Sequence, residues 1–222
     1  MALRVPLLGI NLKCYRQGTS NSALRLARVC QRESERSGIC LIIAAQTSDI
    51  ALLAKIPLPI FAQHVDGISY GARTGWILPE AVAAAGAVGT FLNHSEHKLK
   101  PAELAAAIKG AKRAGLKTIV FATDLKEARA VAALKPDFVA IEPPELIGGK
   151  ISVSSARPEL VKNVVAAIGK EVQVLCGAGI HSKEDVAAAL RLGAVGALVS
   201  SGFVLAPRPR AALRELLGGF VD

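Results

Sequence analysis

A glutamate followed by two prolines is the part of this sequence whose residue types most suggest chemistry. Glu142 comes directly after the apolar run Phe138–Ile141, which is typical of a short buried strand, and the prolines prevent that strand from continuing. The loop beyond them ends in a Gly-Gly pair, which suits a segment that moves or brings its backbone close to a ligand. A general base beneath a lid would have this pattern. The alternative is a solvated glutamate at an ordinary strand exit, and the stretch taken alone favours it.

A lysine and an asparagine close the first apolar segment of the chain, Asn11-Leu12-Lys13. In an extended segment, residues two apart point to the same side. A lysine held there is a point charge suited to a phosphate group or a developing oxyanion. A solvated Lys13 beside a turn-forming Asn11 is the alternative, and this pair alone favours it.

A histidine follows another apolar run, in the sequence Leu92-Asn93-His94-Ser95-Glu96. His94 would lie where a helical turn begins, and the positive end of a helix dipole disfavours a second positive charge at that point. The imidazole would then stay neutral and could donate a hydrogen bond to a carbonyl oxygen. The alternative, also open, is that Asn93 or Ser95 only caps the turn.

Small residues follow two later apolar runs. Gly177-Ala178-Gly179 comes after one of them and Ser200-Ser201 after the next. Such turns expose backbone N–H groups, which commonly bind phosphate. Tight turning alone would also explain them.

All of these residues lie at the ends of strands in a regular alternation of strand-like and helix-like segments. We expect strands at 5–11, 41–44, 57–63, 90–92, 118–121, 138–141, 172–176 and 197–200, and helices at 22–37, 47–55, 79–85, 100–114, 124–134, 158–168, 182–193 and 207–217. Alternating βα units imply a parallel sheet, whereas an open doubly wound sheet usually has fewer strands. Eight units without a linker in 222 residues predict an α/β protein that forms one domain, a (β/α)8 barrel spanning residues 1–222. In that fold the strand exits meet at one mouth.

Composition narrows the class of protein. Hydrophobic residues make up 51% of the chain, which is enough for a large core. No apolar run approaches the roughly 18 residues of a membrane span. The first residues do not match a secretory signal, so we expect a cytoplasmic protein.

The cysteines, histidines and charged residues argue against a metal site and against nucleic-acid binding. The four cysteines and four histidines lack metal-ligand spacing, so we predict reduced thiols and no metal. The net charge of +9 comes from lysines and arginines spaced singly, with only 4% aromatic residues. An anionic small substrate, or a solvated basic surface, therefore explains the charge better than nucleic acid does.

Taken together, the chain resembles the triosephosphate isomerases, in their short archaeal form, over essentially its whole length. The matching stretches are Asn11-Leu12-Lys13, 86–96, Ala140–Gly148, Cys176–Ile180 and Val199–Gly202. The resemblance implies a cofactor-independent isomerase with the TIM-barrel fold. It would interconvert D-glyceraldehyde 3-phosphate and dihydroxyacetone phosphate through an enediolate, in glycolysis and gluconeogenesis.

The same resemblance implies a role for each site residue. Glu142 would be the base, His94 the neutral electrophile and Lys13 the stabiliser of negative charge. Asn11 would orient the substrate, and Glu96 would support Lys13. The segment 143–150 would be the lid. The remaining substrate contacts would be made by Ile147, Gly148, Gly177, Ala178, Gly179, Ser200 and Ser201, mostly through backbone groups.

A homo-oligomer is also implied, either a dimer or the tetramer of the archaeal form, with the third loop reaching into the partner subunit near Asn11-Leu12-Lys13. The sequence departs from the other branch of the family at Asn93, usually Gly, and from common family residues at His97 and Trp76. Two alternatives remain. One is another phosphate-binding barrel isomerase or synthase, and the other is a barrel that binds a phosphorylated ligand without catalysis.

Overall fold

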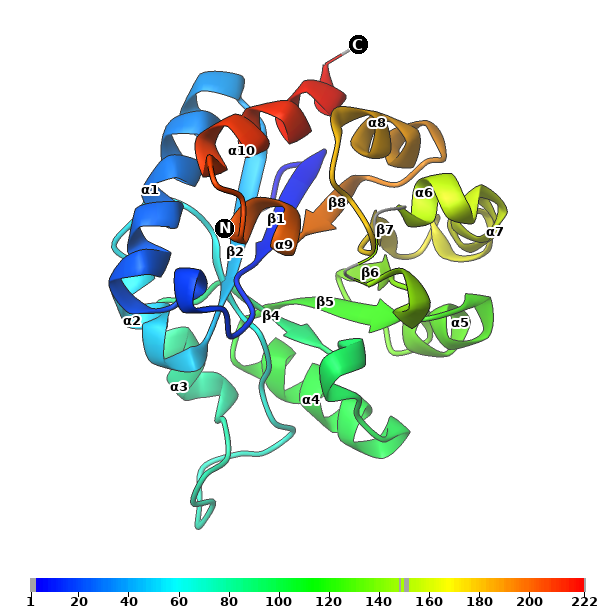
Figure 1. Ribbon diagram of the computed structural model, residues 1–222. Helices are drawn as coiled ribbons and strands as arrows, with labels where there is room; N and C mark the ends of the chain where they lie inside the picture. Colours follow the sequence, from blue (N-terminus) through cyan, green and yellow to red (C-terminus); the bar gives the residue numbers. More distant parts are fainter. Residues whose placement is uncertain (1–2, 148, 150–151, 222) are drawn as a thin grey trace.

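The computed structural model describes residues 3–147, 149 and 152–221. Its strands are β1 (Leu7–Asn11), β2 (Cys40–Ala45), β3 (Ile60–Ala62), β4 (Gly89–Leu92), β5 (Lys117–Ala122), β6 (Phe138–Ile141), β7 (Gln173–Cys176) and β8 (Gly196–Val199). All neighbours are parallel, and β1 pairs with both β2 and β8, so the sheet closes on itself (Figure 1). The predicted (β/α)8 barrel is confirmed.

Helices surround the strands (Figure 1). They are α1 (Ser20–Ser37), α2 (Ile50–Leu53), α3 (Pro79–Ala84), α4 (Pro101–Arg113), α5 (Leu125–Ala132), α6 (Val153–Ala156), α7 (Pro158–Ile168), α8 (Lys183–Arg191), α9 (Ser201–Val204) and α10 (Pro209–Leu217). Short 3₁₀ turns occur at η1 (Arg16–Gly18), η2 (Thr47–Asp49), η3 (Ser95–His97), η4 (Pro144–Leu146) and η5 (Gly218–Phe220).

Four of these elements, at three places in the chain, differ from the sequence expectation. The second helix, expected over 47–55, is split into η2 and the four-residue α2. The helices α6 and α9 were not expected, because four residues are too few to show a helical period. None of the helices in the described part of the chain combines the length and apolar character that crossing a bilayer requires.

The barrel interior forms a closed floor beneath the site. Alternate strand residues point inward, as Ile42 and Ala44 do on β2, while their neighbours pack against the helices. Phe61, Phe91 and Phe121 lie in ring contact across this interior, with centroids 6.1 and 5.2 Å apart in succession. The last of these rings meets the imidazole of His94 at 4.7 Å. The packed interior therefore supports the site from below.

The first and last long helices, α1 and α10, are joined through one buried carboxylate. Glu33 of α1 has no exposed surface and accepts hydrogen bonds from Arg36 (2.7 Å), Arg210 (2.7 Å) and Arg214 (2.9 Å). Burial raises the pKa of this carboxyl, but the three guanidinium groups outweigh it and lower the pKa from 4.5 to about 2. Glu33 is therefore held ionised.

The segment between β3 and α3 reaches away from the barrel (Figure 1). Two hydrogen bonds close its base, from Asp66 N–H to the Ile77 carbonyl (2.9 Å) and from Ile77 N–H to the Asp66 carboxylate (2.6 Å). The aromatic side chains of Tyr70 and Trp76 are 77% and 56% exposed. This protruding segment is the part of the fold with the largest apolar side chains in solvent.

Candidate active site

The imidazole of His94 has a fixed tautomer. His94 follows β4 and begins the turn η3, where its Nδ1 accepts a hydrogen bond from the backbone N–H of Glu96 at 3.1 Å. The carboxylate of Glu96 is farther away, at 3.6 Å, so the backbone contact decides the tautomer. Because an N–H can only donate, Nδ1 carries no hydrogen and Nε2 carries one. The ring is thus neutral, with its N–H turned into the pocket. Neither Asn93 nor Ser95 caps the turn, since the ring of His94 does so.

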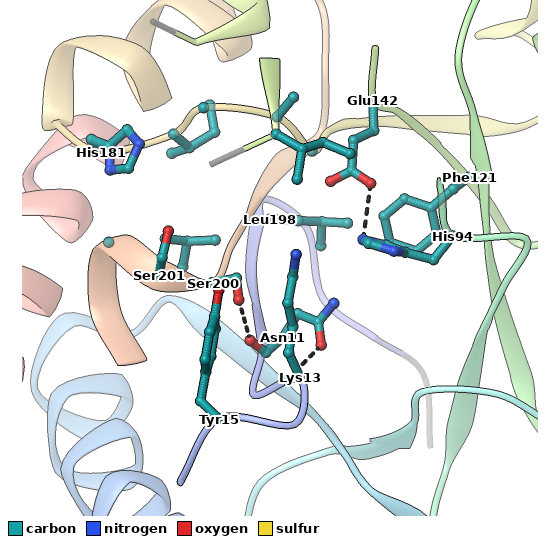
Figure 2. A pocket seen from close by; sticks show the side chains of 17 residues that line it. Asn11, Lys13, Tyr15, His94, Phe121, Glu142, His181, Leu198, Ser200 and Ser201 are labelled. Carbon is teal, nitrogen blue, oxygen red and sulfur yellow. Dashed lines mark hydrogen bonds and ion pairs between the residues drawn. The ribbon is translucent and has the colours of Figure 1, made fainter. Parts of the chain in front are cut away.

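The carboxylate of Glu142 lies opposite that N–H (Figure 2). Its Oε2 is 3.0 Å from His94 Nε2, but it has no hydrogen bond of good geometry. Among the described residues, three buried side-chain polar atoms lack such a partner, and Glu142 Oε2 is the one that belongs to a residue lining this pocket. Buried polar atoms are nearly always paired, so an unpaired carboxylate oxygen marks a position where chemistry is expected.

Gly177 lets the carboxylate sit where it does. The end of β7 passes so close that a Cβ on Gly177 would lie 3.3 Å from both the Cβ and the Oε1 of Glu142. On the other side, the Glu142 N–H continues the sheet by bonding to the Ala122 carbonyl at 2.8 Å. The backbone of the base is therefore fixed, while one oxygen remains available.

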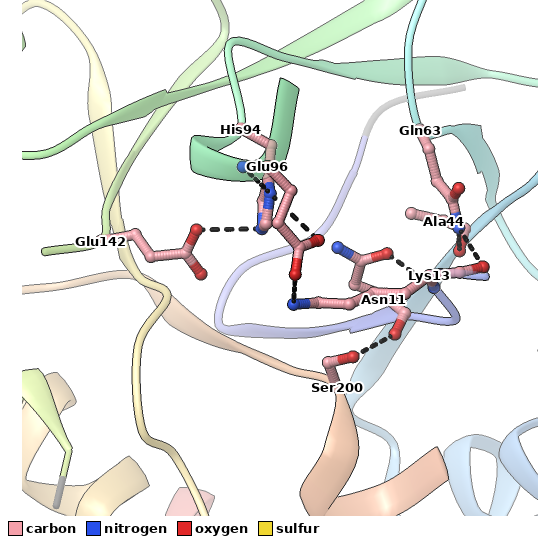
Figure 3. A network of polar contacts seen from close by, with 8 residues as sticks. All are labelled: Asn11, Lys13, Ala44, Gln63, His94, Glu96, Glu142 and Ser200. Carbon is pink, nitrogen blue, oxygen red and sulfur yellow. Dashed lines mark hydrogen bonds and ion pairs between the residues drawn. The ribbon is translucent and has the colours of Figure 1, made fainter. Parts of the chain in front are cut away.

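Lys13 is held in a left-handed backbone conformation, with φ at 47°. Its N–H donates to Asn11 Oδ1 (3.0 Å), and its carbonyl accepts from Gln63 Nε2 (3.0 Å), so both backbone groups are fixed (Figure 3). Its Nζ pairs with Glu96 Oε1 at 2.7 Å. Strain of this kind persists where the surroundings impose it, which is common at functional sites.

The expected extended geometry of Asn11 and Lys13 is wrong, because β1 ends at Asn11 and the chain then turns. Both side chains still reach the same pocket. Asn11 uses its side-chain oxygen to hold the backbone of Lys13, which a two-residue alternation could not indicate.

The turns after the neighbouring strands β7 and β8 both line the pocket. The Ser200 hydroxyl donates to the Asn11 carbonyl at 2.8 Å and so ties the end of β8 to the end of β1 (Figure 3). Because that hydroxyl is occupied, Ser200 can offer a ligand its backbone rather than its side chain. Gly177-Ala178-Gly179, from the turn after β7, lines the pocket beside it.

One pocket brings the expected residues together. It is lined by Asn11, Lys13, Tyr15, His94, Phe121, Glu142, Ile147, Gly177, Ala178, Gly179, Ile180, His181, Leu198, Val199, Ser200, Ser201 and Gly202. Glu96 does not line this pocket, but it contacts two residues that do, Lys13 and His94. Gly148 lies outside the described residues. Within the described part of the chain, no group of three His, Cys, Asp or Glu side chains is placed to hold a metal ion.

Residues 6–213 match the family model for triosephosphate isomerase. The chain belongs to the triosephosphate isomerase family. It is 48% identical to the triosephosphate isomerase of Methanosarcina acetivorans, over 96% of this chain and 97% of that one. It is 46% identical to the one from Methanocaldococcus jannaschii, over 95% and 98% of the two chains. A solved triosephosphate isomerase from Bartonella henselae has the same fold, with a TM-score of 0.71, 18% identity and 98% coverage of both chains.

Several residues that line this pocket were not expected to contact it. Tyr15, Phe121, His181 and Leu198 line the pocket. The imidazole Nε2 of His181 is 2.7 Å from the Gly149 carbonyl. Phe121 and Leu198 are apolar residues near strand ends, where packing and lining cannot be told apart in sequence. Position alone could have suggested His181, since it follows the Gly-Ala-Gly turn closely.

Proposed function

We propose that this protein interconverts dihydroxyacetone phosphate and D-glyceraldehyde 3-phosphate, with Glu142, His94 and Lys13 as catalytic residues. Membership of the triosephosphate isomerase family supports the reaction. The observation that carries the residue assignment is the unpaired Glu142 Oε2, buried 3.0 Å from the Nε2 of a neutral imidazole. A base and a hydrogen-bond donor that face one space suit proton transfer next to a carbonyl group.

The proton would move between neighbouring carbons. Glu142 takes a proton from C1 of dihydroxyacetone phosphate, and the electrons of that C–H bond form a C1–C2 double bond as the C2 carbonyl oxygen becomes an oxyanion. The N–H of His94 and the ammonium of Lys13 stabilise this enediolate. His94 then passes the C1 hydroxyl proton to the C2 oxyanion, which becomes the C2 hydroxyl, and Glu142 returns its proton to C2 as the electrons left on the C1 oxygen form the aldehyde. No cofactor enters the balance.

The phosphate would be bound away from the reacting carbons, by backbone N–H groups of Gly179, Ser200 and Ser201. The Gly177 N–H, also expected to bind it, donates instead to the Ile141 carbonyl at 3.0 Å. The two turns face the same pocket, and the Ser200 hydroxyl is already occupied, both of which support backbone binding. The segment that starts at Pro143 would cover the substrate. Ile147 lines the pocket, and the Gly149 carbonyl contacts His181, so this segment already reaches the residues that follow β7.

The deciding experiment is turnover of both triose phosphates by the purified protein, without added metal or cofactor. We expect conversion in both directions and incorporation of solvent deuterium at the carbon that exchanges its proton. In a His94→Gln variant, whose amide nitrogen stands near the position of Nε2, turnover should fall by about 10²- to 10⁴-fold. Binding of the phosphates without conversion by the parent protein would instead favour a non-catalytic barrel.

The protein would act as a homo-oligomer, dimer or tetramer, in the cytoplasm. Beside the active-site pocket lies a groove of about 610 Å³ whose lining includes Lys13, Cys14 and Ile77. The protruding segment with Tyr70 and Trp76 offers apolar side chains that a second copy could cover. Light scattering should give two or four times the 23.1 kDa chain mass, and a monomer would contradict this part of the proposal.

A further inference from the structure

Asn93, directly before His94, has an unusual backbone conformation. It is 2% exposed and has a φ of 61°, in the left-handed region that most side chains avoid. Asparagine tolerates that region better than most residues, yet glycine would adopt it without steric cost. The side chain of Asn93 must therefore do something that a glycine could not.

That side chain makes three hydrogen bonds to three different segments. Its Nδ2 donates to the Phe121 carbonyl (2.9 Å) and to Glu127 Oε1 (2.8 Å), and its Oδ1 accepts from the Leu99 N–H (3.1 Å). Both amide hydrogens are used, and a flipped amide would place Oδ1 against two acceptors. The orientation of the amide is thus fixed by its partners.

The first and third of these bonds enclose the catalytic turn. The bond from Leu99 closes the stretch 94–99, which contains both His94 and Glu96, the partner of Lys13. The Phe121 carbonyl accepts the hydrogen bond from Asn93, and the Phe121 ring packs edge-on against the imidazole of His94 (Figure 2). The Asn93 amide therefore fixes both the backbone around His94 and the residue, Phe121, against which the His94 ring packs.

The second bond ends on an anchored carboxylate. Glu127 also accepts from Lys98 Nζ (2.7 Å) and, through Oε2, from the N–H and hydroxyl of Thr123 (both 2.8 Å). Burial raises the pKa of Glu127, but these hydrogen bonds outweigh it and lower the pKa below its usual value. Asn93 thus donates to an ionised acceptor that is itself held in place.

We propose that Asn93 is a positioning residue. Its three hydrogen bonds, here called the clamp, hold the His94 imidazole and the Glu96 carboxylate in the positions that catalysis requires. The inference rests on the proposed function of His94. Turnover should be sensitive to the clamp because small displacements of a reacting group are costly. Substrate affinity should not depend on the clamp, since the proposed phosphate contacts lie on the turns after β7 and β8.

The main variant is Asn93→Gly, which keeps the backbone conformation and removes all three bonds. We expect kcat to fall by about 10- to 100-fold with KM changed by less than about threefold. Lys135→Gly is the matched control, since Lys135 has a φ of 54° at a site remote from the pocket, and its kcat should equal the parent value. The ¹⁵N NMR signals of His94 should show one tautomer in the parent and an averaged pair in Asn93→Gly.

A second pair of variants separates hydrogen bonding from side-chain volume. Asn93→Asp has the same shape but turns a carboxylate toward Glu127, so kcat should fall at least as far. Adding Glu127→Gln restores a donor–acceptor pair and should recover about tenfold of that loss. This pair also decides the matter if Asn93→Gly does not fold.

Two results would overturn the proposal. One is a kcat for folded Asn93→Gly within twofold of the parent, and the other is an unchanged defect when Glu127→Gln is added to Asn93→Asp. A parent protein inactive on triose phosphates would contradict the proposed function itself, which is a separate outcome.

Discussion

Glu33 and Glu142 are both buried glutamates, but their surroundings differ in every respect. Three guanidinium groups surround the carboxylate of Glu33, between the outer helices α1 and α10. Glu142, at the barrel mouth, faces a neutral imidazole and has one oxygen without a hydrogen bond. A carboxylate saturated with donors cannot readily accept a proton, whereas an unpaired one can. In our proposal the contrast separates a structural carboxylate from a catalytic one, and it can be tested from both sides.

The largest effect should come from Glu142→Gln. We expect kcat for triose phosphate interconversion to fall by about 10³- to 10⁴-fold, because the base is lost. The thermal unfolding midpoint should stay close to that of the parent, since Oε2 makes no hydrogen bond that the change could remove. Steady-state kinetics and calorimetry on the same preparation measure both. Wild-type-like turnover would rule out Glu142 as the base.

Glu33→Gln should have the opposite profile. Loss of the charge weakens three hydrogen bonds, and we expect the free energy of unfolding to fall by about 2 kcal/mol. This loss of stability is smaller than that expected for a fully buried ion pair, because the three arginine side chains are about half exposed and can be solvated instead. Urea denaturation measures the change. The kcat should not move, and a drop in it would break the division between the two carboxylates.

Acid should remove the contribution of Glu33. Its pKa of about 2 in the folded protein lies below the usual 4.5, so the unfolded chain takes up the proton first as the pH falls. The stabilisation is therefore complete at neutral pH and is lost between about 4.5 and about 2. The stability difference between the parent and Glu33→Gln should shrink by roughly half between pH 7 and pH 3. A difference that grows on acidification would contradict the assignment.

The smallest effect should come from a single arginine. Arg36→Ala leaves Arg210 and Arg214 on the carboxylate, so we expect a loss of only about 0.5 kcal/mol. Arg32→Ala is the control, since Arg32 lies on the same helix and makes no ion pair among the described residues. If both changes have the same effect, the Arg36 contact contributes nothing measurable to stability.

The sequence predicted the catalytic end of the barrel better than its outer helices. Strand exits can be recognised locally, so His94, Glu142 and the Gly177 turn could be placed at one mouth before any contact was known. Glu33 continues the buried spacing of Leu26 and Cys30 on α1, a signal that was available in the sequence. Its arginine partners on α10 could not be found that way, because only the closed barrel brings those helices together.

The clamp around Asn93 shows the same limit at closer range. The sequence allowed Asn93 a role as a cap, which is a local hydrogen bond. Its actual partners on Phe121 and Glu127 are 28 and 34 residues away, and no spacing rule connects them. Lys13 is a second case, since its left-handed turn depends on Gln63, 50 residues on.

The closure of the barrel between β1 and β8 also constrains how the chain can be made. The hydrogen bonds from Arg210 and Arg214 to Glu33 span 177 and 181 residues, and β1 meets β8 over a similar distance. During synthesis, β1 and α1 therefore leave the ribosome long before their last partners exist. Until then β1 keeps one unpaired edge, which other chains could join. The translation of β8 and α10 therefore decides when that hazard ends.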